Sequence, residues 1–247
     1  MSILSVQDLN KSFGAITVSR NLCFELAKGE ALGIIGPNGA GKSSTFNLIG
    51  GNLRPDSGRI ILDGDDITRR PPEQRCRRGI GRTYQIPQPF GGMTVFENLL
   101  VCASFGRHER FDTGAHCAQV LARTGLLRRA DVPARTLTLL ERKRLELARA
   151  LAGKPSLLLL DEIAGGLTDP EARELVGTIN EIHAAGTAIV WIEHVVHALL
   201  AVVTRLMVIN FGEKLMEGEP SAVMRSSEVR RIYMGIDVPG DMKGVVP

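Results

Sequence analysis

The feature that most constrains the fold of this chain is a glycine-rich turn that joins a short apolar run to a helix-like segment. The turn follows the pattern G-x-x-x-x-G-K-[ST] and consists of Gly36, Pro37, Asn38, Gly39, Ala40, Gly41, Lys42 and Ser43. The apolar run, residues 31–35, suits a buried parallel strand, and the segment that begins at Ser44 can open a helix. Strand, loop and helix in this order indicate a phosphate-binding P-loop.

The residue types of the turn suit a nucleotide phosphate. Glycines permit positive φ and let the backbone come close to an anion. We expect the amides of residues 39–42 to converge on a phosphate at a helix N-terminus. The Lys42 ammonium would neutralise the β- and γ-phosphates of ATP, and the Ser43 hydroxyl would ligate Mg²⁺.

Composition favours a globular protein with a sizeable core. The chain has 247 residues, of which 44% are hydrophobic, and this suits one large domain or a domain with a substantial insertion. The formal net charge of +3 is too small to indicate nucleic acid as a partner. The four cysteines form no C-x-x-C pair, so reduced and inert thiols are expected.

Three stretches are locally basic: Arg69-Arg70, residues 75–82 and residues 142–144. We interpret each as the solvated face of a helix, because charged side chains are seldom fully buried. No segment reads as a signal peptide, and no apolar run approaches the roughly 20 residues of a membrane span. We therefore expect a cytosolic chain that reaches a membrane only through a partner.

The pattern along the chain changes from strands to helices and back. Residues 1–85 and 154–237 carry strand-like segments, whereas apolar residues recur at helical spacing through residues 86–153. This alternation predicts an α/β protein with a parallel sheet and an inserted helical subdomain. Residues 238–247 are rich in Pro and Gly and are expected to form an exposed tail.

Finer elements follow from the same patterns. Residues 157–160 and 188–192 are apolar enough for buried strands, and residues 170–184 between them suit an amphipathic helix. A short helix is expected to begin at residues 71–75, with Pro near its first turn. Residues 206–213 are typical of a hairpin strand that reaches its turn at Gly212.

Two carboxylates follow the strand of residues 157–160. At the end of a strand beside a P-loop, Asp161 can position Mg²⁺, usually through water, and Glu162 can act as a general base on the attacking water. By chemistry alone, His194 is more typical of a structural residue, and Phe13 of a packed strand residue. A metal pair of His194 with His197 is not expected, because no cysteine or carboxylate set completes it.

Taken together, these segments resemble the ATP-binding subunit of an ABC transporter. Residues 36–43 are similar to the Walker A motif, and residues 157–161 to Walker B, with Glu162 at the place of the catalytic glutamate. The resemblance covers most of the chain. It implies a P-loop NTPase (RecA-like) core with an inserted α-helical subdomain and an N-terminal antiparallel β subdomain.

The resemblance also implies roles for single residues. Gln85 matches the Q-loop glutamine, which contacts Mg²⁺ and couples the site to the membrane domain. His194 matches the switch histidine that touches the γ-phosphate, and Phe13 matches the aromatic residue that stacks on adenine. Residues 166–170 fall at the D-loop, which crosses to a partner subunit. The implied sites are catalytic Lys42, Gln85, Glu162 and His194; metal-binding Ser43, Gln85 and Asp161; and ATP-binding Phe13, residues 36–43, Ser44 and Thr138.

Within the family, residues 81–85, 93–100, 191–194 and 231–235 resemble ATPases of branched-chain amino acid importers. Relatives in that group handle other amino acids, amides or urea, and a lipopolysaccharide-export ATPase is also similar. The implied partners are transmembrane permease subunits, a second ABC ATPase and, indirectly, a periplasmic or extracellular substrate-binding protein. The implied location is the cytoplasmic face of the inner or plasma membrane, peripheral through the permease.

One motif departs from the family pattern, Leu-Ser-Gly-Gly-Gln. Residues 137–141 read Leu-Thr-Leu-Leu-Glu, so Thr138 keeps a hydroxyl that could donate to a phosphate, but Leu140 replaces a glycine whose amide approaches the γ-phosphate. Glu141 adds negative charge near that anion. We hypothesise a heterodimer, with one competent site built from this P-loop and a partner's regular signature, although a homodimer remains an alternative.

Two rival functions come from other classes. Soluble ABC ATPases of DNA repair or translation carry a long coiled-coil insertion or tandem ATPase domains, and 247 residues leave room for neither. A regulatory subunit that hydrolyses ATP weakly is suggested by the altered motif, whereas the intact Glu162 and His194 argue against it.

Overall fold

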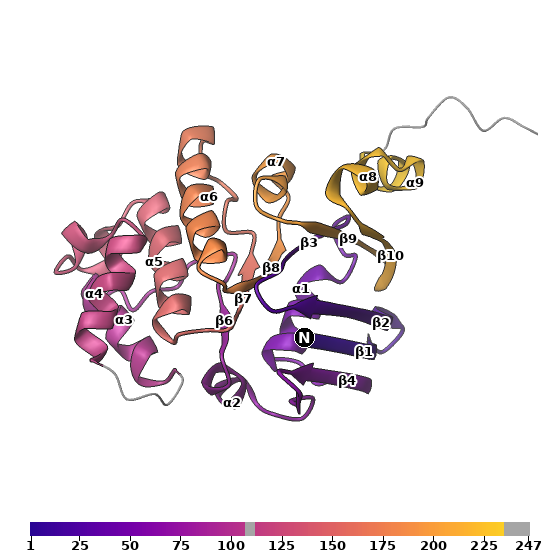
Figure 1. The fold of residues 1–247 in the computed structure, drawn as a ribbon, viewed down its shortest axis with the longest axis horizontal. Helices are drawn as coiled ribbons and strands as arrows, with labels where there is room; N and C mark the ends of the chain where they lie inside the picture. Colours follow the sequence, from indigo (N-terminus) through magenta and orange to yellow (C-terminus); the bar gives the residue numbers. More distant parts are fainter. Residues whose placement is uncertain (107–111, 235–247) are drawn as a thin grey trace, which may run out of the picture.

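The computed structural model describes residues 1–106 and 112–234 and contains two sheets (Figure 1). A four-stranded antiparallel sheet has the order β2-β1-β4-β5. Its strands are β1 (Ser2–Phe13), β2 (Ile16–Ala27), β4 (Ser57–Leu62) and β5 (Asp65–Asp66). This is the N-terminal antiparallel β subdomain that the resemblance implies.

A six-stranded sheet has the order β10-β9-β3-β8-β7-β6. Neighbouring strands are parallel from β9 to β6, and β10 pairs antiparallel with β9. The strands are β3 (Ala31–Ile35), β6 (Ile80–Arg82), β7 (Leu157–Asp161), β8 (Ala188–Ile192), β9 (Arg205–Asn210) and β10 (Glu213–Gly218). Because β3, β7 and β8 are buried along their whole length, they are apolar runs rather than alternating strands.

Helices cover both faces of this sheet (Figure 1). On one side α1 (Lys42–Gly50) packs between the two sheets, where its Phe46 joins Leu4 of β1 and Ile34 of β3 in one buried core. The other side carries a second core that includes Leu99, Leu145 and Trp191. It involves α3 (Val95–Ser104), α4 (Thr113–Arg123), α5 (Leu139–Ala152), α6 (Asp169–Ala184) and α7 (Val196–Leu200).

Shorter elements complete the described chain. They are α2 (Pro72–Arg77), α8 (Pro220–Arg225), α9 (Ser227–Val229), 3₁₀ turns Leu127–Arg129 and Ala134–Thr136, and a π-helical turn Arg230–Met234. In the part of the chain that the structure describes, no helix is both long enough and apolar enough to cross a membrane.

The fold class predicted from the sequence is confirmed, and most element boundaries agree with it. The helix expected from residue 170 begins one residue earlier, at Asp169, and the late hairpin turns at Phe211-Gly212. The expected tail, residues 238–247, lies outside the described residues, as does residue 235 of the ending that suggested the subfamily. All four cysteines are free thiols, and Cys117 is buried.

The interpretation of the basic stretches as solvated helix faces is wrong for Arg69 and Arg70, which are exposed but lie in the connection before α2, and for three further residues. Arg75 and Lys143 are buried, and the Arg82 side chain is only 9% exposed. Each lies inside because its charged group finds acceptors there: backbone carbonyls for Arg75 and Lys143, and the Asp161 carboxylate for Arg82.

Candidate active site

The P-loop lies where β3 ends and α1 begins, and its shape depends on glycine. Gly39 and Gly41 have φ of 79° and 102°, in the left-handed region that glycine favours. A Cβ at Gly36 would lie 2.1 Å from the Ile209 carbonyl oxygen, and one at Gly41 would lie 2.2 Å from that of Val18. The P-loop backbone therefore packs directly against the backbone of β9 and of β2, with no room for a side chain at Gly36 or Gly41.

The N-terminus of α1 is left open for a ligand. Its N-cap residue is Gly41, which offers no side-chain acceptor, and no acidic residue lies in its first turn. The Ala40 amide donates to the Pro37 carbonyl at 3.2 Å within the loop, and the convergence of the amides of residues 39–42 on a phosphate stays a prediction. First-turn amides without acceptors form an anion-binding end.

Lys42 folds back over the loop that precedes it. Its side chain is buried, and Nζ donates to the carbonyls of Gly36 at 2.7 Å and Pro37 at 3.0 Å. Burial lowers the pKa of Lys42, and the nearby Glu162 and Asp161 carboxylates oppose that effect. The ammonium is thus held beside the loop before any anion arrives, while the neighbouring Ser43 stays exposed.

Asp161 ends β7 and is only 5% exposed. Burial raises the pKa of this carboxyl, and Arg82, whose Nη2 lies 3.3 Å from Oδ2, opposes the rise. Arg82 also donates to the Asn47 side chain on α1 at 2.9 Å. The ion pair therefore ties the carboxyl end of β7 to the helix that follows the P-loop.

Glu162 meets two side chains from distant segments. The Gln85 amide donates to its Oε2 at 2.5 Å, and His194 Nε2 lies 2.9 Å from its Oε1. The Glu162 backbone has φ of 45°, which is uncommon for a residue other than glycine and is typical of strained functional positions. The structure thus brings together Gln85, Glu162 and His194, which the sequence placed on three separate stretches.

The residues expected to hold Mg²⁺ share one cavity. Ser43, Gln85 and Asp161 line it together with Asn47. All of them carry oxygen donors, which Mg²⁺ prefers, and the ion usually keeps several waters and binds substrate phosphates as well. Among the described residues no cluster of His, Cys, Asp and Glu could enclose a metal alone. The set fits an ion that arrives with its nucleotide.

Comparison with known proteins decides the family. Residues 19–165 match the family described as ABC transporter, which is more than half of the chain. The chain belongs to the ABC transporter ATPases. One relative, 34% identical over 94% of this chain and 98% of its own length, is the high-affinity branched-chain amino acid transport ATP-binding protein LivG of Escherichia coli (strain K12).

Other relatives of this ABC ATPase carry different names. The lipopolysaccharide export system ATP-binding protein LptB of Haemophilus influenzae is 32% identical over 95% of this chain and 98% of its own length. A crystal structure of an ABC transporter's ATP-binding cassette in its ADP conformation is 30% identical and superposes with a TM-score of 0.87, covering 96% of this chain and all of its own. The chain is therefore an ATP-binding ATPase of a transporter, and its cargo is not decided by these relatives.

Two residues of this ABC ATPase that support the site escaped the sequence analysis. The buried Lys143 ammonium on α5 donates to the carbonyls of Gln85 at 2.9 Å and Glu162 at 3.2 Å. Burial lowers the pKa of Lys143, and Glu193 leads the carboxylates that oppose this. Lys143 thus fastens the helix of the altered motif to both Gln85 and Glu162.

Glu193 performs a similar task for His194. It is 1% exposed, and its Oε1 accepts from the amides of His194 at 3.1 Å and Val195 at 3.3 Å. Its Oε2 accepts from the Ala164 amide and the Trp191 indole. Burial raises the pKa of Glu193 and these bonds oppose it. A charge directly after a buried strand was the available signal, because such a residue needs buried donors.

Phe13 stands at the end of β1 and is 49% exposed. The interpretation of Phe13 as a packed strand residue is therefore wrong. Lys11 Nζ lies 5.2 Å from the centroid of its ring, and an exposed ring of this kind offers area for stacking.

Two residues of the altered motif, Thr138 and Glu141, form hydrogen bonds with each other. Thr138 is the N-cap of α5; its hydroxyl accepts from the Glu141 amide at 3.3 Å, and Glu141 Oε2 accepts from the Thr138 amide at 2.9 Å. Arg129 Nε lies 2.8 Å from the Glu141 carboxylate. Arg129 therefore offsets the negative charge that Glu141 adds to this motif, which the sequence did not indicate. Leu139 beside them is 47% exposed.

Proposed function

We propose that this ABC ATPase powers an importer of branched-chain or other amino acids, or of related amides or urea. The proposed ATP hydrolysis rests on one observation: the Glu162 carboxylate lies between Gln85 and His194 at the end of β7. A positioned carboxylate at this place can take a proton from a water that attacks the γ-phosphate.

The residues act in sequence on bound ATP. Phe13 stacks on the adenine, the open amides of the P-loop and of Ser44 bind the phosphates, and Lys42 offsets their charge. Ser43 and Gln85, with Asp161 through water, would hold Mg²⁺, which would neutralise charge on the phosphate oxygens. Glu162 accepts the proton of the attacking water, and His194 contacts the γ-phosphate.

The permease is proposed to dock beside Gln85. A cavity of about 260 Å³ there is lined by Tyr84, Phe90 and Phe105, which are 47%, 44% and 62% exposed. Exposed aromatic side chains around a hollow suit a partner helix. A cytoplasmic helix of the membrane subunit in this cavity would hold the chain at the cytoplasmic face of the inner or plasma membrane.

A second ATPase with a regular signature is the proposed dimer partner. The α5 N-terminus of this chain is bonded to its own Glu141, and Leu140 stands where the family has glycine. The partner's ATP would therefore meet a poor surface, whereas the P-loop of this chain would close on a regular one. The heterodimer then has one competent site and one weak site.

The choice of cargo is supported by the likeness to the branched-chain amino acid protein of Escherichia coli and by residues 191–194. Lipopolysaccharide export is the alternative, and the Haemophilus influenzae relative at 32% identity supports it. A regulatory subunit with weak hydrolysis is a further alternative, supported by the self-bonded N-terminus of α5.

The test is reconstitution of this chain with permease subunits, a second ATPase and a substrate-binding protein. We expect ATP-dependent uptake of a radiolabelled branched-chain amino acid into vesicles, and its loss with Glu162→Gln. Uptake that persists with Glu162→Gln would show that ATP hydrolysis by this chain does not power transport. ATPase activity that responds to lipopolysaccharide and not to amino acids would replace the importer with the exporter.

A further inference from the structure

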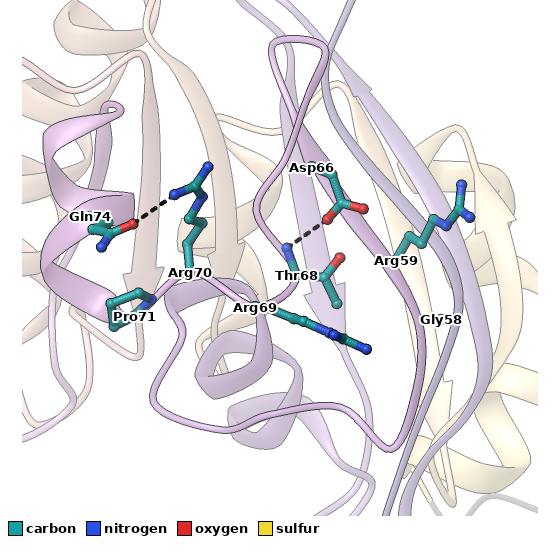
Figure 2. A pocket seen from close by; sticks show the side chains of 8 residues that line it. All are labelled: Gly58, Arg59, Asp66, Thr68, Arg69, Arg70, Pro71 and Gln74. Atoms are coloured by element: carbon teal, nitrogen blue, oxygen red, sulfur yellow. Dashed lines mark hydrogen bonds between the residues drawn. The ribbon is translucent and has the colours of Figure 1, made fainter.

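A second charged cavity lies away from the ATP site, between β4 and α2 (Figure 2). Arg59 on β4 and Arg69 and Arg70 in the connection that leads to α2 line it, and their exposed side chains point in different directions (Figure 2). Asp66, Thr68 and Gln74 complete its polar lining. None of these residues belongs to the proposed ATP site, and the sequence offered no role for the Arg69-Arg70 pair.

The positive charge in this cavity is largely unneutralised. Within the described residues, the side chains of Arg59 and Arg69 make no ion pair or hydrogen bond, and Arg70 donates to the neutral Gln74 amide oxygen at 3.2 Å. Asp66 is the acidic residue in the lining, and its Oδ1 accepts from the Thr68 amide at 2.9 Å (Figure 2). Three guanidinium groups against one carboxylate leave the cavity with excess positive charge.

A buried arginine fixes the wall of the cavity from behind. Arg75 is 1% exposed, and its guanidinium donates to the carbonyls of Thr68 at 2.9 Å and Arg70 at 2.8 Å, both in the lining. It also donates to the Leu48 and Ile49 carbonyls in the last turn of α1. These partners are neutral, so Arg75 adds positive charge behind the cavity and holds the backbone of its wall to α1.

Burial lowers the pKa of Arg75 to about 10, with Asp66 opposing. The side chain therefore remains a cation at neutral pH, although it is surrounded by carbonyls. A buried cation without a carboxylate partner is costly. An anion bound nearby would offset part of that cost.

We propose that this cavity binds a phosphate-bearing anion with at least two negative charges. Guanidinium groups match phosphate oxygens with paired hydrogen bonds, and Arg59, Arg69 and Arg70 line the cavity from two segments. Arg75 keeps the backbone of the wall in place, so binding has to order only the exposed arginine side chains. The phosphate could belong to a free polyphosphate-like solute or to a lipid headgroup, since both present the same oxygens.

The test uses the full chain with its P-loop saturated by MgADP, so that the probe cannot bind there. Inorganic pyrophosphate is titrated by calorimetry with Mg²⁺ in excess, and lipid binding is measured with vesicles of phosphatidylglycerol against phosphatidylcholine. We expect Arg59→Gln and Arg69→Gln each to weaken binding about tenfold, and added salt to weaken it further. Arg173→Gln, an exposed arginine on α6, is the matched control and should leave binding unchanged.

The outcomes separate clearly. Binding of pyrophosphate that depends on Arg59 and Arg69 supports a free solute, and binding to phosphatidylglycerol vesicles that depends on them supports a lipid headgroup. Absence of both, or binding that is equally strong in the two arginine variants and the control, overturns the proposal. Affinity for ATP should be unaffected by these variants, and it reports separately on the proposed function and on folding.

Discussion

The N-termini of α1 and α5 differ in whether side chains of this protein cap them. At α1 the N-cap is Gly41, with no side-chain cap and no acidic residue in the first turn. At α5 the N-cap Thr138 and its partner Glu141 form a capping box, and Arg129 holds Glu141 in place. The start of α1 therefore leaves its first-turn amides to a ligand, whereas at α5 the Thr138 hydroxyl takes up the Glu141 amide and the Glu141 carboxylate adds negative charge at the helix end.

This difference indicates that a helix N-terminus suits an anion better when its own side chains leave the first-turn amides without acceptors. A capping residue contributes about 1 kcal/mol to stability, and a carboxylate near the N-terminus adds ~0.3–1 kcal/mol through the helix dipole. The α5 helix has this stabilisation built in. The α1 helix lacks it, so an external phosphate can supply it.

The sharpest test of the α1 side is Glu162→Gln. The amide cannot accept a proton, so we expect the turnover of the assembled transporter at this site to fall by about 10²- to 10⁴-fold. MgATP binding should persist, because the P-loop and Lys42 are unchanged. Steady-state ATPase and nucleotide affinity measured together check this, and normal turnover in the variant would remove Glu162 from the role of general base.

Replacement of Lys42 tests whether ATP binding depends on the buried Lys42 ammonium beside the P-loop. A hydrogen bond to a charged group is worth about 1.5–3 kcal/mol, so Lys42→Ala should weaken MgATP binding about 10- to 100-fold. Lys214→Ala, at an exposed lysine on β10, is the control and should bind as the unmodified chain does. Equal affinity of the two variants for MgATP would contradict the assignment.

The α5 side is tested by restoring the family glycine. With Glu162→Gln as background, the remaining ATPase of the heterodimer reports on the partner's site. We expect Leu140→Gly to raise that rate about tenfold, as one regained amide contact of ~1.4 kcal/mol would do. Leu127→Gly, at an exposed leucine outside the motif, is the control, and an unchanged rate in Leu140→Gly would show that this leucine does not limit the partner's site.

The smallest expected effect concerns the capping box itself. Burial alone would raise the pKa of Glu141, but its bonds to Arg129 and Thr138 bring it below its ordinary value of 4.5. A lowered folded-state pKa stabilises the fold above that value, and this stabilisation disappears as pH falls through the folded-state pKa. Glu141→Gln should therefore reduce the free energy of unfolding by about 0.5–1 kcal/mol at neutral pH.

Urea unfolding at neutral pH and at acidic pH measures this difference. It should shrink as the carboxyl group is protonated in the unmodified chain. A loss of stability that is the same at both pH values would show that the Glu141 charge contributes nothing. Thr138→Ala removes the other half of the box without changing a charge, and its effect should be much less dependent on pH.

Sequence reasoning predicted the elements of this protein because their signals are local. The P-loop pattern, the apolar strand before Asp161 and the helical spacing of residues 86–153 each lie within one continuous stretch. Hydrophobic periodicity reports which face of an element is buried, and a glycine-rich turn reports where the backbone must come close to something. These signals were sufficient for the fold class and for the stretches from which the candidate site is built.

Only the tertiary structure decided how charges are paired across those stretches. Glu162 meets Gln85 and His194, Glu141 meets Arg129, and Arg75 is buried among carbonyls of α1 and the wall of a basic cavity. Sequence alone cannot reveal such pairings, because the burial of a charge depends on donors and acceptors that distant segments supply. The chain itself specified an open α1 N-terminus through Gly41 and a capping box at α5 through Thr138 and Glu141; the fold decided that Arg129 would neutralise Glu141.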